Sequence, residues 1–300
     1  MKTEHLALVA AALMAIIVGA AIVATSSIVA DAGPVTIAFL RYFIGVILML
    51  PLALRLKWSP VPAKDLLPIA VLGIFQFAVL IVLLNFSVIY IDAGLAALIF
   101  ATLPLLTIIL ASALGQEQFT GRKFVGILLT ILGVGYAVGA TAFTEPLGPG
   151  GWLGILAAFA SALCGAACSV FYKPYLIRYP TLQISIMAMS ASVLALAGLA
   201  VMEGMPAALP TFSIGVWAIL LFIGLASAGG YYLWLYALRH ALASNVAVFL
   251  GFSPISAAVI AALFIAQPLT RQDIIGSLLV ASGLLISLWQ RRAITPAAIP

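Results

Sequence analysis

The sequence predicts an all-α polytopic membrane protein whose ten transmembrane helices form two five-helix repeats of inverted topology. Hydrophobic residues make up 65% of the 300-residue chain and charged residues only 7%, whereas soluble domains carry about 25% charged residues. The apolar residues form continuous runs of helix-spanning length instead of the alternating ten-residue strands of a membrane β-barrel. In addition, residues 93–133 align without a gap on residues 243–283.

The first five predicted helices are separated by residues that favour turns or begin helices. These helices cover residues 7–29, 35–55, 66–90, 92–114 and 122–142. Short polar or proline-containing stretches lie between them: Asp31–Pro34, Trp58–Pro62, the single acid Asp92 and Gly115–Gln118. An acid at the position of Asp92 is typical of a helix N-cap.

The second five predicted helices follow the loop Glu145–Gly151 and cover residues 151–173, 181–202, 212–238, 243–266 and 271–290. Prolines mark two of their boundaries, in the stretch Pro206–Pro210 and at Gln267–Pro268. The connections are short throughout, so the sequence leaves no room for a separate soluble domain.

The internal duplication divides the chain into residues 1–145 and 146–300. An offset of 150 residues pairs Pro104 with Pro254 and Thr120 with Thr270, and an offset of 146 pairs Pro34 with Pro180. Abundant Ala, Gly and Leu could produce chance matches, but paired prolines and a gapless register are harder to obtain in that way. Because five is odd, the two copies enter the membrane from opposite sides, which predicts inverted repeats.

The basic residues predict the orientation of the chain in the membrane. With the N-terminus in the cytoplasm, eleven Lys and Arg residues lie inside, against Arg271 outside and Arg41 within a helix. The eleven are Lys2, Arg55, Lys57, Lys64, Arg122, Lys123, Lys173, Arg178, Arg239, Arg291 and Arg292. This bias predicts a plasma-membrane protein, of the inner membrane in a bacterium, with both termini cytoplasmic, and it accounts for the net charge without a nucleic-acid partner.

Motifs in the fourth and fifth helices occur twice and resemble those of a known family. They comprise Ala93–Leu98, Pro104, Gly115–Glu117, Thr120, Gly126 and Gly133, and in the second half Ala243–Val248, Pro254, Thr270, Gly276 and Gly283. The chain resembles the EamA domain of the drug/metabolite transporter superfamily. That resemblance implies a ten-helix transporter with a central cavity lined by helices one, three, four, six, eight and nine, and often export of amino acids or other metabolites. The second half departs where Glu117 becomes Gln267.

Arg41 is the one clearly intramembrane charge in the predicted helices, about 10 Å from the outer end of its helix at 1.5 Å per residue. A charge at this depth costs several kcal/mol unless it finds a partner or reaches the interface. Arg41 could therefore bind a substrate carboxylate, or it could brace helices through backbone carbonyls. Its repeat equivalent is Met187, so either role belongs to one half alone.

Further candidates for substrate binding are polar or aromatic residues inside the predicted helices. Aromatic residues of the eighth helix, Tyr231, Tyr232 and Trp234, could line the cavity or form an interfacial belt. Five smaller polar residues are also candidates: Ser26, Asn85, Thr102, Asn245 and Ser253. Hydroxyl groups in membrane helices often bond their own backbone instead.

Pro104 and Pro254 are predicted hinges, because proline removes a helical hydrogen bond and kinks the helix at matching places in the two halves. Gly135 and Gly139 form a pair of small residues four apart, which could pack helices within the molecule or support a homodimer. Cys164 and Cys168 also lie four apart and are expected to be packing residues.

The function predicted from these features is secondary transport of amino acids or related amphipathic solutes, in the export direction, by alternating access at a midplane cavity. All eight Asp and Glu residues fall at helix ends or in loops, so we expect no catalytic site, metal site or cofactor. Two alternatives stay open at this point. One is an integral-membrane enzyme of lipid or isoprenoid metabolism, which needs clustered acids or histidines, and the other is a non-transporting membrane subunit.

Overall fold

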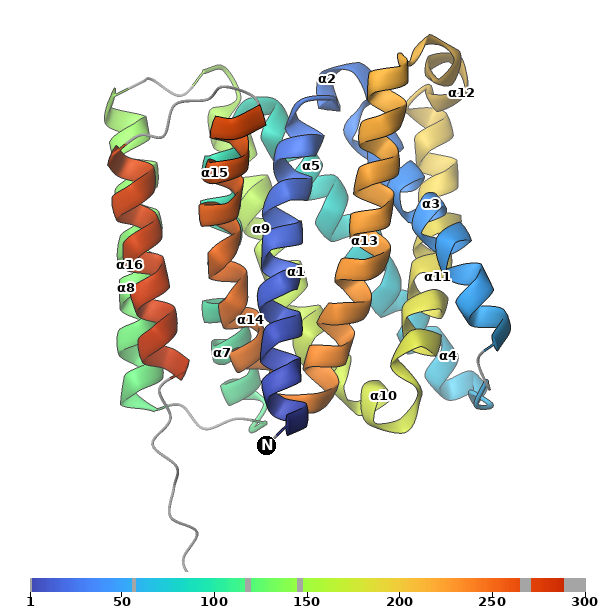
Figure 1. Cartoon of the computed structure of the whole chain (residues 1–300), viewed down its shortest axis with the longest axis horizontal. Coiled ribbons are helices and arrows are strands. Elements are labelled where there is room, and N and C mark those ends of the chain that lie inside the picture. Colours follow the sequence, from blue (N-terminus) through green and yellow to red (C-terminus); the bar gives the residue numbers. More distant parts are fainter. Residues whose placement is uncertain (1, 56–57, 117–119, 145–147, 265–270, 289–300) are drawn as a thin grey trace, which may run out of the picture.

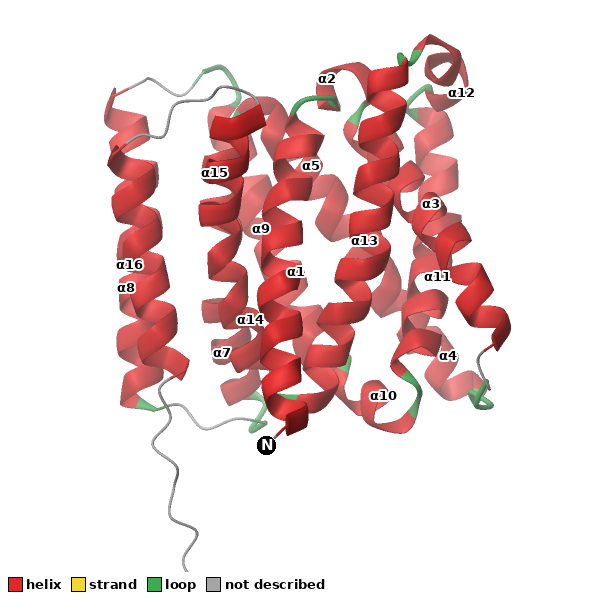
Figure 2. Ribbon diagram, viewed as in Figure 1, coloured by secondary structure: helices red, strands yellow, loops and turns green. Residues whose placement is uncertain are grey.

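The computed structural model describes residues 2–55, 58–116, 120–144, 148–264 and 271–288. Across these ranges the chain is a bundle of helices without a strand (Figure 1, Figure 2). The predicted all-α membrane class is confirmed, because eight segments of the described chain are long and apolar enough to cross a membrane. The helices α8 and α16 fall outside that set, so the count of ten stays a prediction.

The helices of the first half begin and end within a few residues of the predicted ranges. They are α1 (Lys2–Ser26), α2 (Val29–Ala32), α3 (Pro34–Arg55), α4 (Ala63–Gly73), the π-helical turn η1 (Ile74–Val79), α5 (Leu80–Tyr90), α6 (Ala93–Phe100), α7 (Leu103–Ala113) and α8 (Gly121–Thr144). The predicted cap is confirmed: Asp92 Oδ1 accepts a 2.8 Å hydrogen bond from the Leu95 amide.

The helices of the second half follow the same plan. They are α9 (Gly151–Phe171), α10 (Lys173–Arg178), α11 (Thr181–Met202), α12 (Met205–Ala208), the 3₁₀ turn η2 (Leu209–Thr211), α13 (Ile214–His240), α14 (Ala243–Val248), the 3₁₀ turn η3 (Phe249–Phe252), α15 (Ser253–Phe264) and α16 (Arg271–Leu288). Ser213 begins α13 by accepting a hydrogen bond from the Val216 amide at 3.3 Å.

Packing partners in the first half have counterparts in the second. Helix α1 packs against α13 and α15, and α9 packs against α5 and α7. Two further pairs, α3 with α11 and α8 with α16, join corresponding helices of the two halves. In Figure 1, α1 starts at the lower face of the bundle, whereas α9 starts at the upper face and leads into α10 below. Equivalent helices thus run in opposite directions, the arrangement expected of inverted repeats.

Polar contacts tie the halves together at both faces. At the upper face, the Glu203 carboxylate at the end of α11 accepts hydrogen bonds from the amides of Val35 and Thr36, which are the first turn of α3. At the lower face, Tyr179 donates a 2.6 Å hydrogen bond to Asp65, and this bond to the carboxylate raises the pKa of the Tyr179 phenol. Each contact joins a residue before position 146 to one after it.

Pro104 and Pro254 lie directly after breaks in the fourth and ninth predicted helices. Pro104 is in the first turn of α7, after the break at residues 101–102 that follows α6. Pro254 is in the first turn of α15, after the 3₁₀ turn η3. Since proline fits the first turn of a helix without losing a hydrogen bond, each residue starts a new helix instead of kinking a continuous one.

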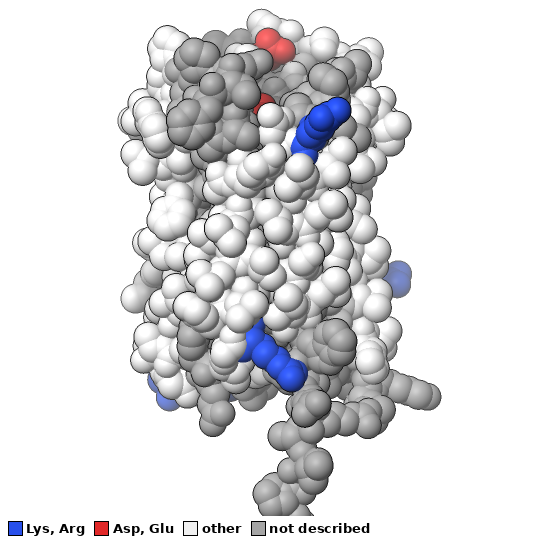
Figure 3. Space-filling view, turned by 90° about the vertical axis from the view of Figure 1, so that its left-hand side faces the viewer, with Lys and Arg blue, Asp and Glu red and all other residues white. Residues whose placement is uncertain are grey.

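Helices α8 and α16 pack on each other through two glycines. A Cβ atom on Gly133 would lie 2.7 Å from the Gly276 carbonyl oxygen, and one on Gly283 would overlap that of Gly126. A Cβ atom on Gly135 would meet open space, so Gly135 is not needed for the contact with α16, and the surroundings of Gly139 are outside what the structure describes. Figure 3 shows this face with its charged residues mostly toward the two ends. A homodimer through it stays a prediction.

Candidate functional site

A cavity lies between the two halves, at mid-height in the bundle. It holds about 810 Å³ of empty space, mouth included, and is lined from α1, α3, η1, α5, α6, α7, α9, α13 and η3. Along α1 its lining runs from Met14 to Thr25, and along α5 from Leu80 to Val88. These are the parts of both helices that extend from mid-height to the upper face, so the cavity extends upward from the centre.

Arg41 is the charged residue of the cavity lining. Only 8% of the residue is exposed. Its Nε donates a 2.8 Å hydrogen bond to Ser227 Oγ on α13. In the described part of the chain no carboxylate lies within ion-pair distance of Arg41, and none lines the cavity. The guanidinium carbon also lies over the Tyr42 ring, 5.2 Å from its centroid. Both partners are neutral, so the buried guanidinium remains an unneutralised charge, which an anionic ligand would stabilise.

Aromatic rings surround the lower part of the cavity. Phe77 on η1 packs edge-on against Tyr42, with ring centroids 4.7 Å apart, and against Tyr231 at 4.2 Å. Tyr172 extends the group, with its ring centroid 6.4 Å from that of Tyr231. All four rings are at least 95% buried. They form a buried cluster of rings at one side of the cavity.

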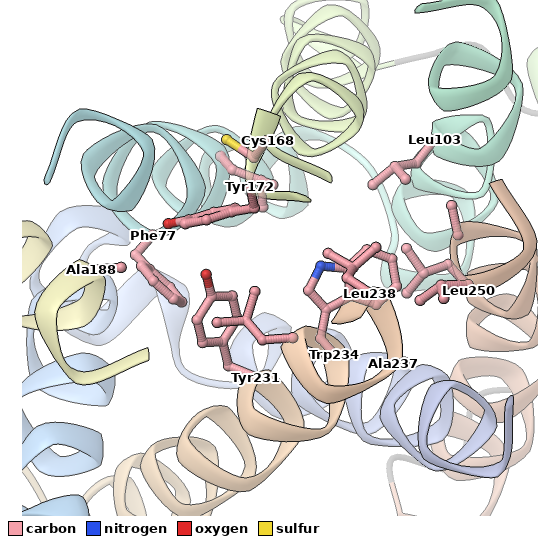
Figure 4. Packing of buried hydrophobic residues seen from close by; sticks show 14 of the residues in the cluster. Phe77, Leu103, Cys168, Tyr172, Ala188, Tyr231, Trp234, Ala237, Leu238 and Leu250 are labelled. Atoms are coloured by element: carbon pink, nitrogen blue, oxygen red, sulfur yellow. The ribbon is translucent and has the colours of Figure 1, made fainter. Parts of the chain in front are cut away.

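Four polar atoms of the lining have no hydrogen-bond partner among the described residues. They are Thr25 Oγ1, Gln76 Oε1, Tyr231 OH and Trp234 Nε1. Figure 4 shows the Tyr231 hydroxyl and the Trp234 indole nitrogen pointing into the open space between α9 and α13. Because buried polar groups are normally bonded, and an unbonded one costs about 1–3 kcal/mol, this concentration at one cavity indicates a site for a polar ligand or water.

The structure brings four of the predicted binding residues together and leaves five elsewhere. Arg41, Asn85, Tyr231 and Trp234 line the cavity. The five that do not are Ser26, Thr102, Tyr232, Asn245 and Ser253. Ser26 and Thr102 donate to carbonyls three residues back in their own helices, the alternative role for such hydroxyls. Tyr232 is 39% exposed on the outside of the bundle.

Several lining residues were missed by sequence reasoning. Gln76 offered a signal, because an amide in the middle of an apolar helix needs a partner or a cavity. Tyr42 and Ser227 gave no comparable signal, since hydroxyl-bearing residues are common in these helices and their contacts join distant segments. The missed residues of the lining are Thr25, Tyr42, Gln76, Phe77 and Ser227.

Asn85 has a local structural contact as well as a place in the lining. Its Nδ2 donates a 2.9 Å hydrogen bond to the carbonyl oxygen of Pro34, the first residue of α3. The contact joins α5 to the start of the helix that carries Arg41. Asn85 thus helps to position α3 beside the cavity.

Comparison with known proteins points to transport. The sequence profile of the EamA-like transporter family matches the chain twice, at residues 5–139 and 152–289. A protein from Archaeoglobus fulgidus named as an uncharacterized transporter is 29% identical over 264 residues, which are 86% of this chain and 90% of that protein. A probable terminal-alkyne amino-acid exporter from Streptantibioticus cattleyicolor is 27% identical over 228 residues, 75% and 73% of the two chains.

A solved crystal structure shares the fold. It aligns with a TM-score of 0.72 over 99% of both chains at 17% sequence identity. At that identity the likeness concerns the arrangement of the helices. It gives no information about the ligand of the cavity.

Proposed function

The chain belongs to the EamA-like transporter family, and from that premise we propose that it exports amino acids or related amphipathic carboxylates. The protein is a multi-pass membrane transporter and not an enzyme. The finer proposal is secondary transport by alternating access, with the cavity between the halves as the substrate site. The single observation that supports it most strongly is the buried, unneutralised Arg41 in the cavity lining.

The carboxylate of the substrate is assigned to Arg41. Nε of Arg41 is already bonded to Ser227, which leaves the two terminal nitrogens of the guanidinium for a ligand. A carboxylate matches that planar pair of donors in a bidentate contact. The same contact would neutralise the buried charge, so affinity and specificity for an anionic group come from one residue.

The rest of the substrate is assigned to the aromatic part of the cavity. Phe77, Tyr231 and Trp234 offer flat apolar surfaces, and the last two also carry unpartnered donors. Such rings suit a side chain that is apolar along most of its length, while Gln76 Oε1 supplies an acceptor for an ammonium group. An amphipathic amino acid has a carboxylate, an apolar side chain and an ammonium group, one for each of these parts of the cavity. The name of the Streptantibioticus relative as an amino-acid exporter supports the same class and the direction of export.

Alternating access is proposed from the asymmetry of the cavity. Its lining along α1 and α5 runs toward the upper face, while the buried rings of Tyr42, Phe77, Tyr172 and Tyr231 cluster at its other side, where we place the closed gate. Opening the opposite side requires the halves to move relative to each other, and the helix breaks before Pro104 and Pro254 are the proposed hinges. Phe100 and Leu103 flank the first break, Leu250 lies within the second, and all three line the cavity. Duplicated halves of inverted topology are the basis of such a motion in many transporters.

The proposed location is the plasma membrane, with the lower face in the cytoplasm. Arg55, Lys64, Arg178 and Arg239 lie at helix ends on the lower face, where α3, α10 and α13 end and α4 begins. An excess of Lys and Arg on one side is typical of the cytoplasmic side. Both termini would then be cytoplasmic, and the described cavity would extend toward the outside.

Uptake into proteoliposomes tests the proposal. Purified protein is reconstituted and radiolabelled L-phenylalanine, L-leucine and L-tryptophan are offered, with protein-free vesicles as the control. We expect flux that saturates with concentration and is inhibited by the other members of the set. Flux no greater than in protein-free vesicles for every amphipathic carboxylate tested would reject this substrate class.

A further inference from the structure

The third membrane segment contains a π-helical turn that faces the cavity. Within η1 the hydrogen bonds run five residues back, as in the bond from the Leu80 amide to the Phe75 carbonyl. Turns of this kind are rare inside α-helices and are frequently found at functional sites. Here the turn carries Gln76 and Phe77, which both line the cavity.

Three side chains of α9 donate hydrogen bonds to carbonyl groups in and beside this turn. Ser161 Oγ donates to the Leu80 carbonyl at 2.8 Å, and Cys164 Sγ donates to that of Phe75 at 3.1 Å. Cys168 Sγ donates to the carbonyl of Leu72 at 3.7 Å, within the range of a sulfur donor. Spacings of three and four residues place the three donors on one face of α9. We call Ser161, Cys164 and Cys168 the donor row.

The carbonyls that the donor row contacts are those at which the helical hydrogen-bond pattern changes. Leu72 lies before η1, Phe75 within it and Leu80 directly after it. A side-chain donor that bonds such a carbonyl stabilises the irregular turn over a regular α-helix. The donors come from the second half of the chain and the acceptors from the first, so the turn depends on contact between the halves.

The residue directly before the turn is held by close packing against α11. A Cβ atom on Gly73 would overlap the backbone of Ala188 on α11. Helix α11 therefore approaches directly at the residue before η1, while α9 donates hydrogen bonds from another side. The turn is thus held by two helices of the second half.

The turn fixes how the two parts of this segment are rotated about their common axis. One residue corresponds to about 100° of rotation in an α-helix, because 3.6 residues complete a turn. Converting η1 to regular α-helix would therefore rotate α4 relative to α5. Gln76 and Phe77 would no longer face the same cavity as Asn85.

We propose that the donor row positions Gln76 and Phe77 for substrate by holding η1, so that Cys164 and Cys168 set substrate affinity without touching the substrate. This inference rests on the proposed function for its transport readout but not for its structural one. Both thiols are positioning residues in this account. Neither lines the cavity.

Two matched variants of the cysteine pair test the inference. C164A/C168A removes both donors, whereas C164S/C168S replaces each thiol by a smaller hydroxyl donor. We expect hydrogen–deuterium exchange of the amides of residues 74–80 to rise about tenfold in the alanine variant and about twofold or less in the serine variant. Two weak sulfur hydrogen bonds together contribute about as much as one ordinary hydrogen bond. The single variants C164A and C168A give intermediate exchange and serve if the double variant does not fold.

A chemical test uses the fact that the chain has two cysteines. N-ethylmaleimide on the wild-type protein should raise the KM for L-phenylalanine about fivefold or more, and it should leave C164S/C168S unchanged. Equal exchange at residues 74–80 in the wild type and both double variants would overturn the inference. If the wild type transports none of the amino acids, the proposed substrate class is wrong. Hydrogen–deuterium exchange at residues 74–80 still tests whether the donor row stabilises η1.

Discussion

Arg41 Nε donates a 2.8 Å hydrogen bond to Ser227 Oγ in the wall of the cavity, from α3 of the first half to α13 of the second. Ser227 Oγ in turn donates to the Ile223 carbonyl at 2.7 Å. The hydroxyl proton is therefore committed to Ile223, and its oxygen is left to accept from Arg41. This orients one edge of the guanidinium toward α13 and leaves its other donors for a ligand.

Replacing Arg41 should impair carboxylate substrates selectively. We expect Arg41→Gln to lower kcat/KM for L-phenylalanine about tenfold or more, because a hydrogen bond to a charged group contributes about 1.5–3 kcal/mol. L-phenylalaninol, which has a hydroxymethyl group in place of the carboxylate, should be affected much less. The measurement is competition by the two compounds for uptake into proteoliposomes.

Ser227→Ala is the control for the bracing role of Arg41. It removes the acceptor on α13 and keeps the positive charge, so carboxylate selectivity should persist with a smaller loss of rate. If Arg41→Gln lowers kcat/KM equally for both compounds and also lowers the thermal unfolding temperature, then Arg41 braces helices and does not bind the carboxylate.

The uncompensated charge of Arg41 also predicts that the protein exchanges substrate across the membrane faster than it transports substrate in one direction. When the cavity is empty, the buried Arg41 has to pass through the closed state without a counter-ion, which is costly in a low-dielectric environment. A bound carboxylate removes that cost. We expect unlabelled L-phenylalanine inside the vesicles to accelerate uptake of labelled L-phenylalanine several-fold. Equal initial rates into empty and loaded vesicles would contradict this reasoning.

Neighbouring aromatic residues of α13 should differ in their effect on transport. Trp234→Phe removes the unpartnered indole N–H of the cavity, and we expect KM to rise about threefold to tenfold, as for the loss of about one hydrogen bond. Tyr232→Phe removes a hydroxyl outside the cavity and should leave KM unchanged. A larger effect at Tyr232 than at Trp234, in the same uptake measurement, would place the substrate elsewhere.

The neighbouring residues Tyr231 and Tyr232 show which part of the site could not be predicted from the sequence. Tyr231 lines the cavity and Tyr232 does not, although they are adjacent, because successive residues of a helix point about 100° apart. Their residue type, depth and flanking glycines are the same. The choice between them is made by packing against Phe77 and Tyr172, from segments far away in the chain.

The fold was more predictable, because its main determinants are local. Continuous apolar runs bounded by turn residues predicted a helix at residues 35–55, and α3 covers Pro34–Arg55. The turn η1 was not predictable, since nothing in Ile74–Val79 requires a π-helix and its stabilising donors lie on α9, more than 80 residues away. Arg41 was identifiable from the sequence by its charge alone. Its partner Ser227 was not.

The upper contact between the halves should contribute to stability. Glu203 accepts from the Val35 amide at 3.0 Å and from the Thr36 hydroxyl at 2.7 Å, and so caps α3 from outside that helix. Glu203→Ala should lower the free energy of unfolding by about 0.5–2 kcal/mol, as the loss of an N-cap does. Glu203→Gln keeps an acceptor oxygen and should lose less. Thermal unfolding in detergent compares them, and equal unfolding temperatures for the wild type and Glu203→Ala would show that the cap contributes nothing.

The central claim is that Arg41 binds the carboxylate of the substrate in the cavity between the halves. Isothermal titration calorimetry of the purified protein, with L-phenylalanine and L-phenylalaninol as ligands of the wild type and of Arg41→Gln, tests it most directly. We predict that the wild type binds L-phenylalanine more tightly than L-phenylalaninol and that Arg41→Gln abolishes this preference. An unchanged preference in a folded Arg41→Gln protein would contradict the account.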